Sequence, residues 1–124
     1  MTEPMTDSMT ELALFELLTL ECRVDAAGTV RYCNARGQLH RLYGPAVEYS
    51  DGSTFWYQND QLHRVDGPAI EYPDGHSAWY QNGQLHRADG PAIEYNDGSC
   101  EWYINGKELT EAEWHQQVAS METV

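Results

Sequence analysis

Short apolar and aromatic segments alternate with polar turn residues over most of this chain. Asn82-Gly83 separates the segment 78–81 from the segment 84–87. Asn-Gly is the preferred pair for a two-residue type I′ turn, because both central residues need a positive φ. Asp74-Gly75 and Asp97-Gly98 are expected to form the same kind of turn between neighbouring strands. The pattern predicts short strands joined by tight turns in an antiparallel meander.

The meander is built from a unit that recurs every 23 residues. Copies of Gln-Leu-His-Arg begin at Gln38, Gln61 and Gln84, and each is followed by Gly-Pro-Ala and a Glu-Tyr pair. A fixed period of this size marks a repeat architecture, in which one unit is stacked along an axis. Proline has no N–H to donate to a strand ladder, so pairing is expected to break at Pro68 and Pro91. The predicted fold is mainly β, drawn out along one axis.

Helices are predicted only at the two ends of the repeats. Residues 1–7 form a predicted disordered leader, and a Ser-x-x-Glu capping box opens a largely apolar helix over 8–18. A second capping box opens a short helix over 110–120. The end units of a repeat array are usually altered because they close an exposed apolar end. The two helices are therefore expected to cap the sheet ends, within a single domain spanning 8–124.

The repeats are expected to span about residues 20–109. They begin with a predicted hairpin formed by residues 20–25 and 29–33. This hairpin is interpreted as a worn copy of the unit, because Gly28 lies near the place where later copies carry a turn glycine.

The charge of the chain restricts its partners. It has 20 acidic and 7 basic residues among 124, for a formal net charge of −13. Such a field favours basic partners and repels nucleic acid and anionic membranes, although solubility alone is the commonest reason for an acidic surface. Cys22, Cys33 and Cys100 lack metal-site spacing and are expected to be free thiols in a reducing compartment. A cytoplasmic protein is predicted.

One set of residues keeps its order and spacing from copy to copy. Its members are Trp79, Asn82, Gly83, His86, Gly90, Tyr95, Asp97, Gly98 and Trp102, and all of them recur one period earlier except Gly83, whose place is taken by Asp60. This pattern resembles the MORN repeat over about residues 28–109. The resemblance implies one hairpin per repeat, laid side by side into an elongated, twisted single sheet. The variant Leu-His-Arg-x-Asp-Gly-Pro-Ala, with Arg87 where MORN repeats have glycine, is similar to repeats in phage and prophage proteins and in bacterial antitoxins.

The histidines His40, His63 and His86 recur once per repeat. Two strands per repeat place successive histidines about 9–10 Å apart, which is too far to share a metal ion with Zn–N bonds of about 2.0–2.1 Å. Each is instead expected to hydrogen-bond the adjacent turn, with the aspartate of the following Asp-Gly-Pro as a partner. We predict no metal or cofactor site. No nucleophile–base pair, phosphate loop or HExxH motif points to an enzyme.

Rows of acidic and aromatic residues are the candidates for binding. Trp56 and Tyr57 point to opposite faces of a strand, so one aromatic row is expected to be core beneath the helices and the other an exposed strip typical of interfaces. Evenly spaced acids on a rod can imitate a phosphate backbone, and glutamate in mid-strand is a poor choice on propensity alone. Solvation and turn formation are the alternative explanation, strongest for the turn aspartates. The predicted partner-binding residues are Glu48, Glu71, Glu94, Asp51, Asp74, Asp97, Tyr57, Tyr80 and Tyr103.

Three functions fit these observations, none of them catalytic. The first is a phage-encoded, anti-CRISPR-like inhibitor that masks the basic nucleic-acid-binding surface of a bacterial defence or DNA-processing protein. The second is an antitoxin or immunity protein that caps a toxin through the aromatic strip. The third is a small-ligand or nucleotide-sequestering protein with pockets between protomers. This function would require an oligomer such as a homodimer. For the leading hypothesis we expect no direct contact with nucleic acid or membranes, and the cytoplasm of a bacterial host cell as the compartment.

Overall fold

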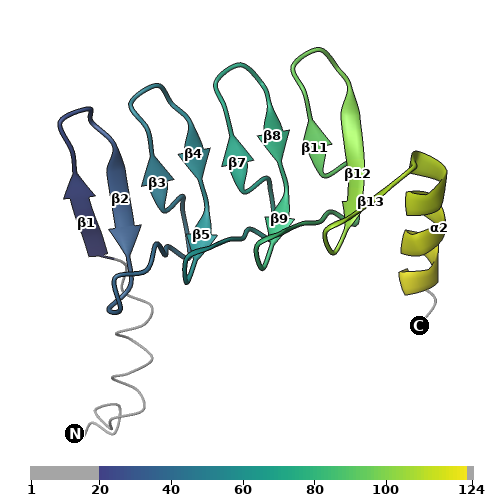
Figure 1. The fold of residues 1–124 in the computed structure, drawn as a ribbon, viewed down its shortest axis with the longest axis horizontal. Helices are drawn as coiled ribbons and strands as arrows, with labels where there is room; N and C mark the ends of the chain where they lie inside the picture. Colours follow the sequence, from purple (N-terminus) through teal and green to yellow (C-terminus); the bar gives the residue numbers. More distant parts are fainter. Residues whose placement is uncertain (1–19, 123–124) are drawn as a thin grey trace, which may run out of the picture.

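The computed structural model describes residues 20–122, which form a rod of β-hairpins with one helix at its C-terminal end (Figure 1). The helix is α2 (Glu111–Glu122). The strands are β1 (Leu20–Val24), β2 (Val30–Cys33), β3 (Val47–Glu48), β4 (Thr54–Phe55), β5 (Tyr57–Gln58), β6 (Gln61–Leu62), β7 (Ile70–Glu71), β8 (Ser77–Ala78), β9 (Tyr80–Gln81), β10 (Gln84–Leu85), β11 (Ile93–Glu94), β12 (Cys100–Ile104) and β13 (Lys107–Leu109).

Most of these strands form one antiparallel sheet in the order β1-β2-β3-β4-β7-β8-β11-β12-β13. Each repeat adds two strands to it, for example β7 and β8, which place Ile70 opposite Ala78 and Glu71 opposite Ser77. The hairpins β5–β6 and β9–β10 are separate two-stranded sheets, and their turns lie along the edge of the rod away from the main hairpin tips (Figure 1). The mainly β meander predicted from the sequence is confirmed.

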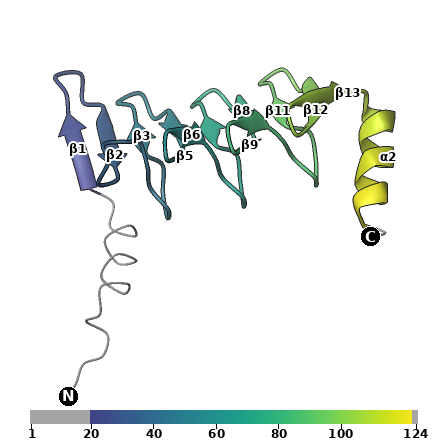
Figure 2. The same ribbon diagram turned by 60° about the horizontal axis from the view of Figure 1, so that its bottom comes forward.

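The helix predicted over 110–120 is confirmed as α2. Thr110 Oγ1 accepts a hydrogen bond from Glu113 N at 3.1 Å, and the Glu113 carboxylate accepts one from Thr110 N at 2.9 Å, which is a reciprocal capping box. The helix stands at the end of the sheet and not on one of its faces (Figures 1 and 2). The expectation of an aromatic core beneath helices is therefore wrong for residues 20–122. Over the same residues, no helix combines the length and apolar character needed to span a bilayer.

The N-terminal predictions have different outcomes. The leader 1–7 and the helix 8–18 lie outside the described residues. The first hairpin is confirmed, since β1 and β2 pair antiparallel with Val24 opposite Val30. The expectation of three free thiols is wrong, because Cys33 is disulfide-bonded. Cys100, on β12, is free and exposed.

Two kinds of turn join the strands. Asn82 and Gly83 both have positive φ, 53° and 80°, as the predicted two-residue turn requires. The Asp-Gly turns differ, because at 74–75 only Gly75 has positive φ. There Tyr72 N donates to His76 O at 3.0 Å and Gly75 N to Tyr72 O at 3.1 Å, which closes a three-residue loop. The expectation that Asp-Gly forms the same turn as Asn-Gly is wrong; the αL glycine instead follows a tight turn of the preceding residues.

Neighbouring repeats are joined through the short hairpins. Asn82 N, at the turn of one repeat, donates to Nδ1 of His63 in the preceding repeat at 3.0 Å. Gly83 N donates to Leu62 O at 2.8 Å, and Arg64 N donates to Tyr80 O at 3.0 Å. His40 and His86 make the equivalent bond to the Asn59 and Asn105 amides at 3.1 and 3.0 Å. The histidine row is therefore a set of joints between repeats.

The buried side chains form thin rows on both faces of the sheet. Ala46, Ala69 and Ala92 have no exposed surface, while Val47 and Ile70, which follow them in the chain and point to the other face, are 3% and 9% exposed. A single layer has no other sheet to pack against, so each repeat is stabilised mainly by its neighbours, as in other repeat arrays.

Replacing Gly83 with valine is expected to lower the free energy of unfolding by about 1–3 kcal/mol, the usual cost of a non-glycine residue held in a disfavoured backbone region. The position has room, since a Cβ there would lie 3.8 Å from Gln61, so the cost comes from the φ of 80° and the β-branch. Urea denaturation measures it. Gln84→Val, on the adjacent strand, is the control; equal stability of the two variants would contradict the turn assignment.

Stability is expected to fall as the pH is lowered from about 7.5 to 5.5. His86 accepts the Asn105 N–H through the Nδ1 lone pair, so protonation of that nitrogen breaks this joint. Burial lowers the pKa of His86. A lowered histidine pKa stabilises fully above the unfolded value of about 6.5, and this stabilisation is lost as the pH falls toward the folded value.

The His86→Asn variant is the matched control, because its Oδ1 can accept the same amide N–H and does not titrate. Its denaturation midpoint is expected to depend less on pH than that of the parent. The aspartates whose pKa is lowered, such as Asp51 and Asp74, lose their stabilisation only below about pH 4, outside this window. A parent protein equally stable at pH 7.5 and 5.5 would contradict the role of the joints.

Candidate protein-binding surface

Arg64 is held in a clamp by four neighbouring groups. Its guanidinium lies over the Trp56 ring, with Cζ 3.9 Å from the ring centroid. Nη1 donates to the Pro68 carbonyl at 3.1 Å and lies 3.5 Å from the Glu71 carboxylate, while Nε lies 3.2 Å from that of Asp66. The side chain is 21% exposed. The Arg-x-Asp-Gly-Pro part of the motif is therefore a structural clamp, in which a stacked cation also satisfies a loop carbonyl.

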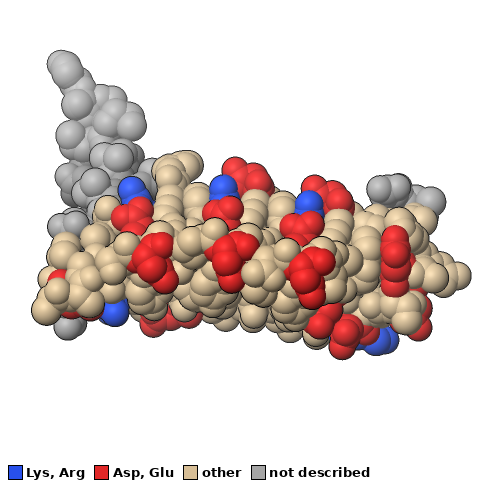
Figure 3. Space-filling model, turned by 90° about the horizontal axis from the view of Figure 1, so that it is seen from above, with Lys and Arg blue, Asp and Glu red and all other residues tan. Residues whose placement is uncertain are grey.

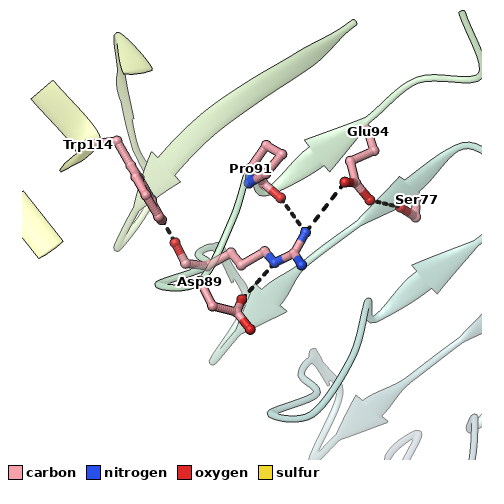
Figure 4. Close-up of polar contacts among 6 residues, drawn as sticks. Ser77, Asp89, Pro91, Glu94 and Trp114 are labelled. Carbon is pink, nitrogen blue, oxygen red and sulfur yellow. Dashed lines mark hydrogen bonds and ion pairs between the residues drawn. The ribbon is translucent and has the colours of Figure 1, made fainter. Parts of the chain in front are cut away.

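The next repeat contains the same clamp, and Figure 4 shows its polar contacts. Arg87 stacks on Trp79 with Cζ 3.8 Å from the centroid, and Nη1 donates to Pro91 O at 3.1 Å. Its guanidinium also contacts the carboxylates of Asp89 at 2.8 Å and Glu94 at 3.6 Å. The side chain is 17% exposed, so this cation too is directed inward.

The first clamp is less complete. Arg41 stacks on Tyr32 at 4.0 Å, donates to Pro45 O at 3.2 Å and lies 3.3 Å from Glu48. Tyr43 occupies the position that is Asp66 in the next copy, and it is 88% exposed. This clamp therefore lacks the second carboxylate.

The clamp explains the glycine of Asp-Gly-Pro. A Cβ at Gly67 would lie 2.6 Å from Cζ of Arg64, and one at Gly90 would lie 2.7 Å from Cζ of Arg87. Contacts that close require the guanidinium to move. The guanidinium thus lies between an aromatic ring and the glycine backbone, and only glycine leaves room for it.

The helix α2 completes the row of stacks. Trp102 is the last of the repeated tryptophans, and no arginine follows it at the usual spacing. Trp114, from α2, packs against it with ring centroids 4.8 Å apart and is itself 5% exposed. Trp114 Nε1 also donates to the backbone carbonyl of Arg87 at 2.8 Å (Figure 4). The capping helix therefore fills the place that the next repeat would occupy.

The predicted glutamate row lies within these clamps. Glu48, Glu71 and Glu94 are on one face of the sheet, and strand pairing places Thr54 and Ser77 between them. Each carboxylate lies 3.3, 3.5 or 3.6 Å from an arginine of its own repeat. The row is thus balanced locally by cations, and reversing it to lysine would place an ammonium beside a guanidinium. Its role in binding stays a prediction.

The predicted tip aspartates Asp51, Asp74 and Asp97 lie where the main hairpins turn, and all three are exposed. The Oδ1 of each accepts the amide N–H two residues later, at 2.8, 3.0 and 2.9 Å. These backbone bonds, together with Ser or His side chains, hold the pKa of each carboxyl below its usual range. Acidic side chains recur at even spacing along this side of the rod (Figure 3). The tips are thus a row of ionised acids with no cation stacked against them.

The histidines differ from the prediction in their partners. They bond a turn, but it is the Asn turn of the next repeat. The aspartate of Asp-Gly-Pro contacts arginine, as Asp66 contacts Arg64 and Asp89 contacts Arg87. The aspartate is therefore not the histidine's partner. Within residues 20–122, no three His, Cys, Asp or Glu side chains gather as a metal-ligand set.

The predicted tyrosines Tyr57, Tyr80 and Tyr103 are half-buried, and burial raises the pKa of each. Their orientation away from Trp56 and its equivalents stays a prediction. Tyr49 and Tyr72 are more exposed, at 40% and 44%. Tyr49 and Tyr72, which lie next to the main hairpin tips, are thus more exposed than the tyrosines that the sequence hypothesis selected.

These exposed rings belong to a continuous aromatic ladder, which we define as Tyr49, Phe55, Tyr72, His76 and Tyr95. Successive centroids are 5.4, 5.8, 6.5 and 5.5 Å apart, all edge to face. Such pairs contribute about 0.5–1.5 kcal/mol beyond their buried area. The sequence signal was available, because a tyrosine follows each glutamate of the paired row and so points to the other face.

An open hollow of about 490 Å³ lies at the hairpin tips. It is lined by two ladder rings, Tyr72 and His76, and by the tip acids Asp51 and Asp74. Nδ1 of His76 lies 2.8 Å from the Asp74 carboxylate. The hollow combines aromatic surface with negative charge, which suits a cationic group.

No protein-family model, curated protein or solved structure matches this chain. The resemblance to MORN repeats stays a prediction, and the binding surface rests on its own geometry.

Gly67→Ala is expected to lower the free energy of unfolding by about 1–2 kcal/mol, the sum of a weakened cation–π stack and a lost hydrogen bond. In an Arg64→Ala background the same substitution should cost little, because the displaced guanidinium is absent. Urea denaturation of the double-mutant cycle measures this coupling. Val65→Ala, a neighbour 68% exposed, is the control. Additive effects of the two substitutions would show that the glycine does not serve the clamp.

Proposed function

We propose that this protein is a non-enzymatic inhibitor whose acidic rod masks the basic, nucleic-acid-binding surface of a partner protein. The observation that carries the proposal is the unequal use of charge in the fold. Arg41, Arg64 and Arg87 are stacked on aromatic rings and paired with acids, and Arg31 lies 3.2 Å from Asp25. Most described cations are thus neutralised inside the structure, while the tip aspartates point outward.

The spacing of the tips supports the same proposal. Each repeat adds two strands, so successive tips are about 9.4–9.8 Å apart at the usual strand spacing of 4.7–4.9 Å. Asp51, Asp74 and Asp97 are ionised across the physiological range, as carboxylates with an ordinary pKa are, and the loop hydrogen bonds lower the pKa of each further. A rigid row of fixed charges loses little conformational freedom on binding, which favours affinity. The row offers a basic groove an alternative to a phosphate backbone, although its charges are more widely spaced.

The partner we propose is a bacterial defence or DNA-processing protein, and the inhibitor would be phage-encoded and act in the cytoplasm of the host. The disulfide at Cys33 weighs against that compartment, since reducing cytosols disfavour disulfides.

An antitoxin that caps a toxin is the second candidate. The exposed aromatic ladder favours it, because tyrosine is enriched where interfaces bury their core. The two functions differ in their response to salt. Contacts between exposed charges weaken as the Debye length shortens to about 3 Å at 1 M, whereas binding through buried aromatic rings persists.

The test uses the triple variant Asp51→Asn, Asp74→Asn and Asp97→Asn. Asparagine keeps the acceptor for the loop amide, so the turns should be preserved while the charge is removed. A partner isolated from host cells on the immobilised protein is loaded with fluorescent DNA, and displacement of the DNA is followed by anisotropy. The parent protein is expected to displace DNA at low salt, and the triple variant to do so at least tenfold less effectively.

The matched control is the triple variant Glu3→Gln, Asp7→Asn and Glu11→Gln. It removes three acids outside the repeats, so its net charge equals that of the tip variant. It is expected to displace DNA as the parent does. A tip variant as effective as the parent would refute the role of the aspartates. Binding that persists at 1 M salt without displacing DNA would favour the antitoxin.

A further inference from the structure

The aromatic ladder and the tip aspartates run side by side along the rod. Tyr72 contributes to both the ladder and the hollow, and Asp74 lines the same hollow. Each repeat contributes one tyrosine at Tyr49, Tyr72 or Tyr95 and one aspartate two residues further along the chain. The surface therefore has a period of one repeat in both aromatic and negative groups.

That period sets a condition on any extended ligand lying along the rod. Two strands per repeat give about 9.4–9.8 Å between equivalent sites. A polyproline II helix rises about 3.1 Å per residue and has three residues per turn, so every third side chain returns to the same side after about 9.3 Å. A β-strand ligand does not match, because its residues i and i+3 point to opposite faces.

The chemistry of each tyrosine–aspartate site determines which ligand side chain can bind there. A guanidinium or ammonium is attracted to the face of a tyrosine ring and to a nearby carboxylate. Tyr49 and Tyr72 are exposed by 40% and 44%, and burial together with the Glu101 carboxylate raises the pKa of Tyr95, so that its hydroxyl stays protonated. Cations in the three clamps stack on the opposite face of the sheet, on Trp56 and its equivalents, and do not compete for this surface.

We infer that the ladder binds a proline-rich, basic segment in the polyproline II conformation, with an arginine or lysine at every third residue. The inference deepens the proposed function, since it specifies which part of a basic partner lies on the rod. Aromatic surfaces are suited to such segments because the polyproline II helix is preformed and loses little entropy on binding. The basic residues occupy successive repeats, and the prolines between them face away or pack on the rings.

The test titrates the intact protein into a fluorescein-labelled peptide, (Arg-Pro-Pro)5, and follows anisotropy. The comparison peptide has the same composition with its five arginines in one block. We expect the periodic peptide to bind at least fivefold more tightly than the block peptide. Equal affinity would show only a general attraction of opposite charges and would overturn the inference.

Two variants locate the binding. Tyr72→Ala is expected to weaken the periodic peptide about twofold to fivefold, the factor given by one exposed cation–π contact of 0.5–1 kcal/mol. Tyr43→Ala removes a tyrosine that is 88% exposed but outside the ladder, and it should leave affinity unchanged. Equal losses in both variants, or no loss in Tyr72→Ala with its melting temperature preserved, would place the peptide elsewhere and overturn the inference.

The result is separable from the proposed function. A protein that displaces DNA from its partner but does not distinguish the two peptides retains the inhibitor role and lacks this binding mode. Preference for the periodic peptide without displacement of DNA supports the binding mode and counts against the inhibitor role.

Discussion

The stacking of one arginine guanidinium between an aromatic ring and a glycine backbone is the contact on which each repeat depends. In one repeat, Arg64 connects Trp56, which lies between two strands, to the loop that ends at Pro68. That loop interrupts strand pairing, because proline has no amide hydrogen to donate. The arginine donates to the carbonyl of this proline, so the acceptor of the loop is satisfied although no strand pairs with it there. A thin sheet without a second layer thereby acquires a packed interior on one face.

The same contact determines how the protein distributes its charge. Each clamp uses a cation inside the repeat, and the glutamate beside it is balanced by that cation. At the hairpin tips, Asp74 and its equivalents lie outside the clamps and accept amide hydrogen bonds that the loops need. The tip aspartates thus stabilise the loops and also give the surface its negative charge. This double use explains why acidity in a repeat is not by itself evidence for a partner, and why the neutral isostere asparagine separates the two roles.

Joining the repeats requires a second set of contacts. Each histidine receives an amide hydrogen from the next turn, and Trp114 closes the last stack where no further arginine follows. Because these contacts link only adjacent units, the array transmits order from one repeat to the next along its length. A rod with regularly spaced surface groups is the consequence, and the ligand that we propose would be recognised by its period.

The sequence by itself determined the period, the strands, the Asn-Gly turns and the C-terminal helix, because each depends on residues close together in the chain. It also placed Trp56 and Tyr57 on opposite faces, which follows from strand alternation alone. Only the tertiary structure decided the partners of the charged residues. Arg64 and Glu71, or their equivalents, occur together in every copy, which is a signal of pairing. The two residues are seven positions apart, however, and the loop between them follows a path that the sequence does not define. The exposure of Tyr72 and the position of α2 at the sheet end likewise depend on how the repeats stack, since burial is a property of neighbours in space and not of neighbours in the chain.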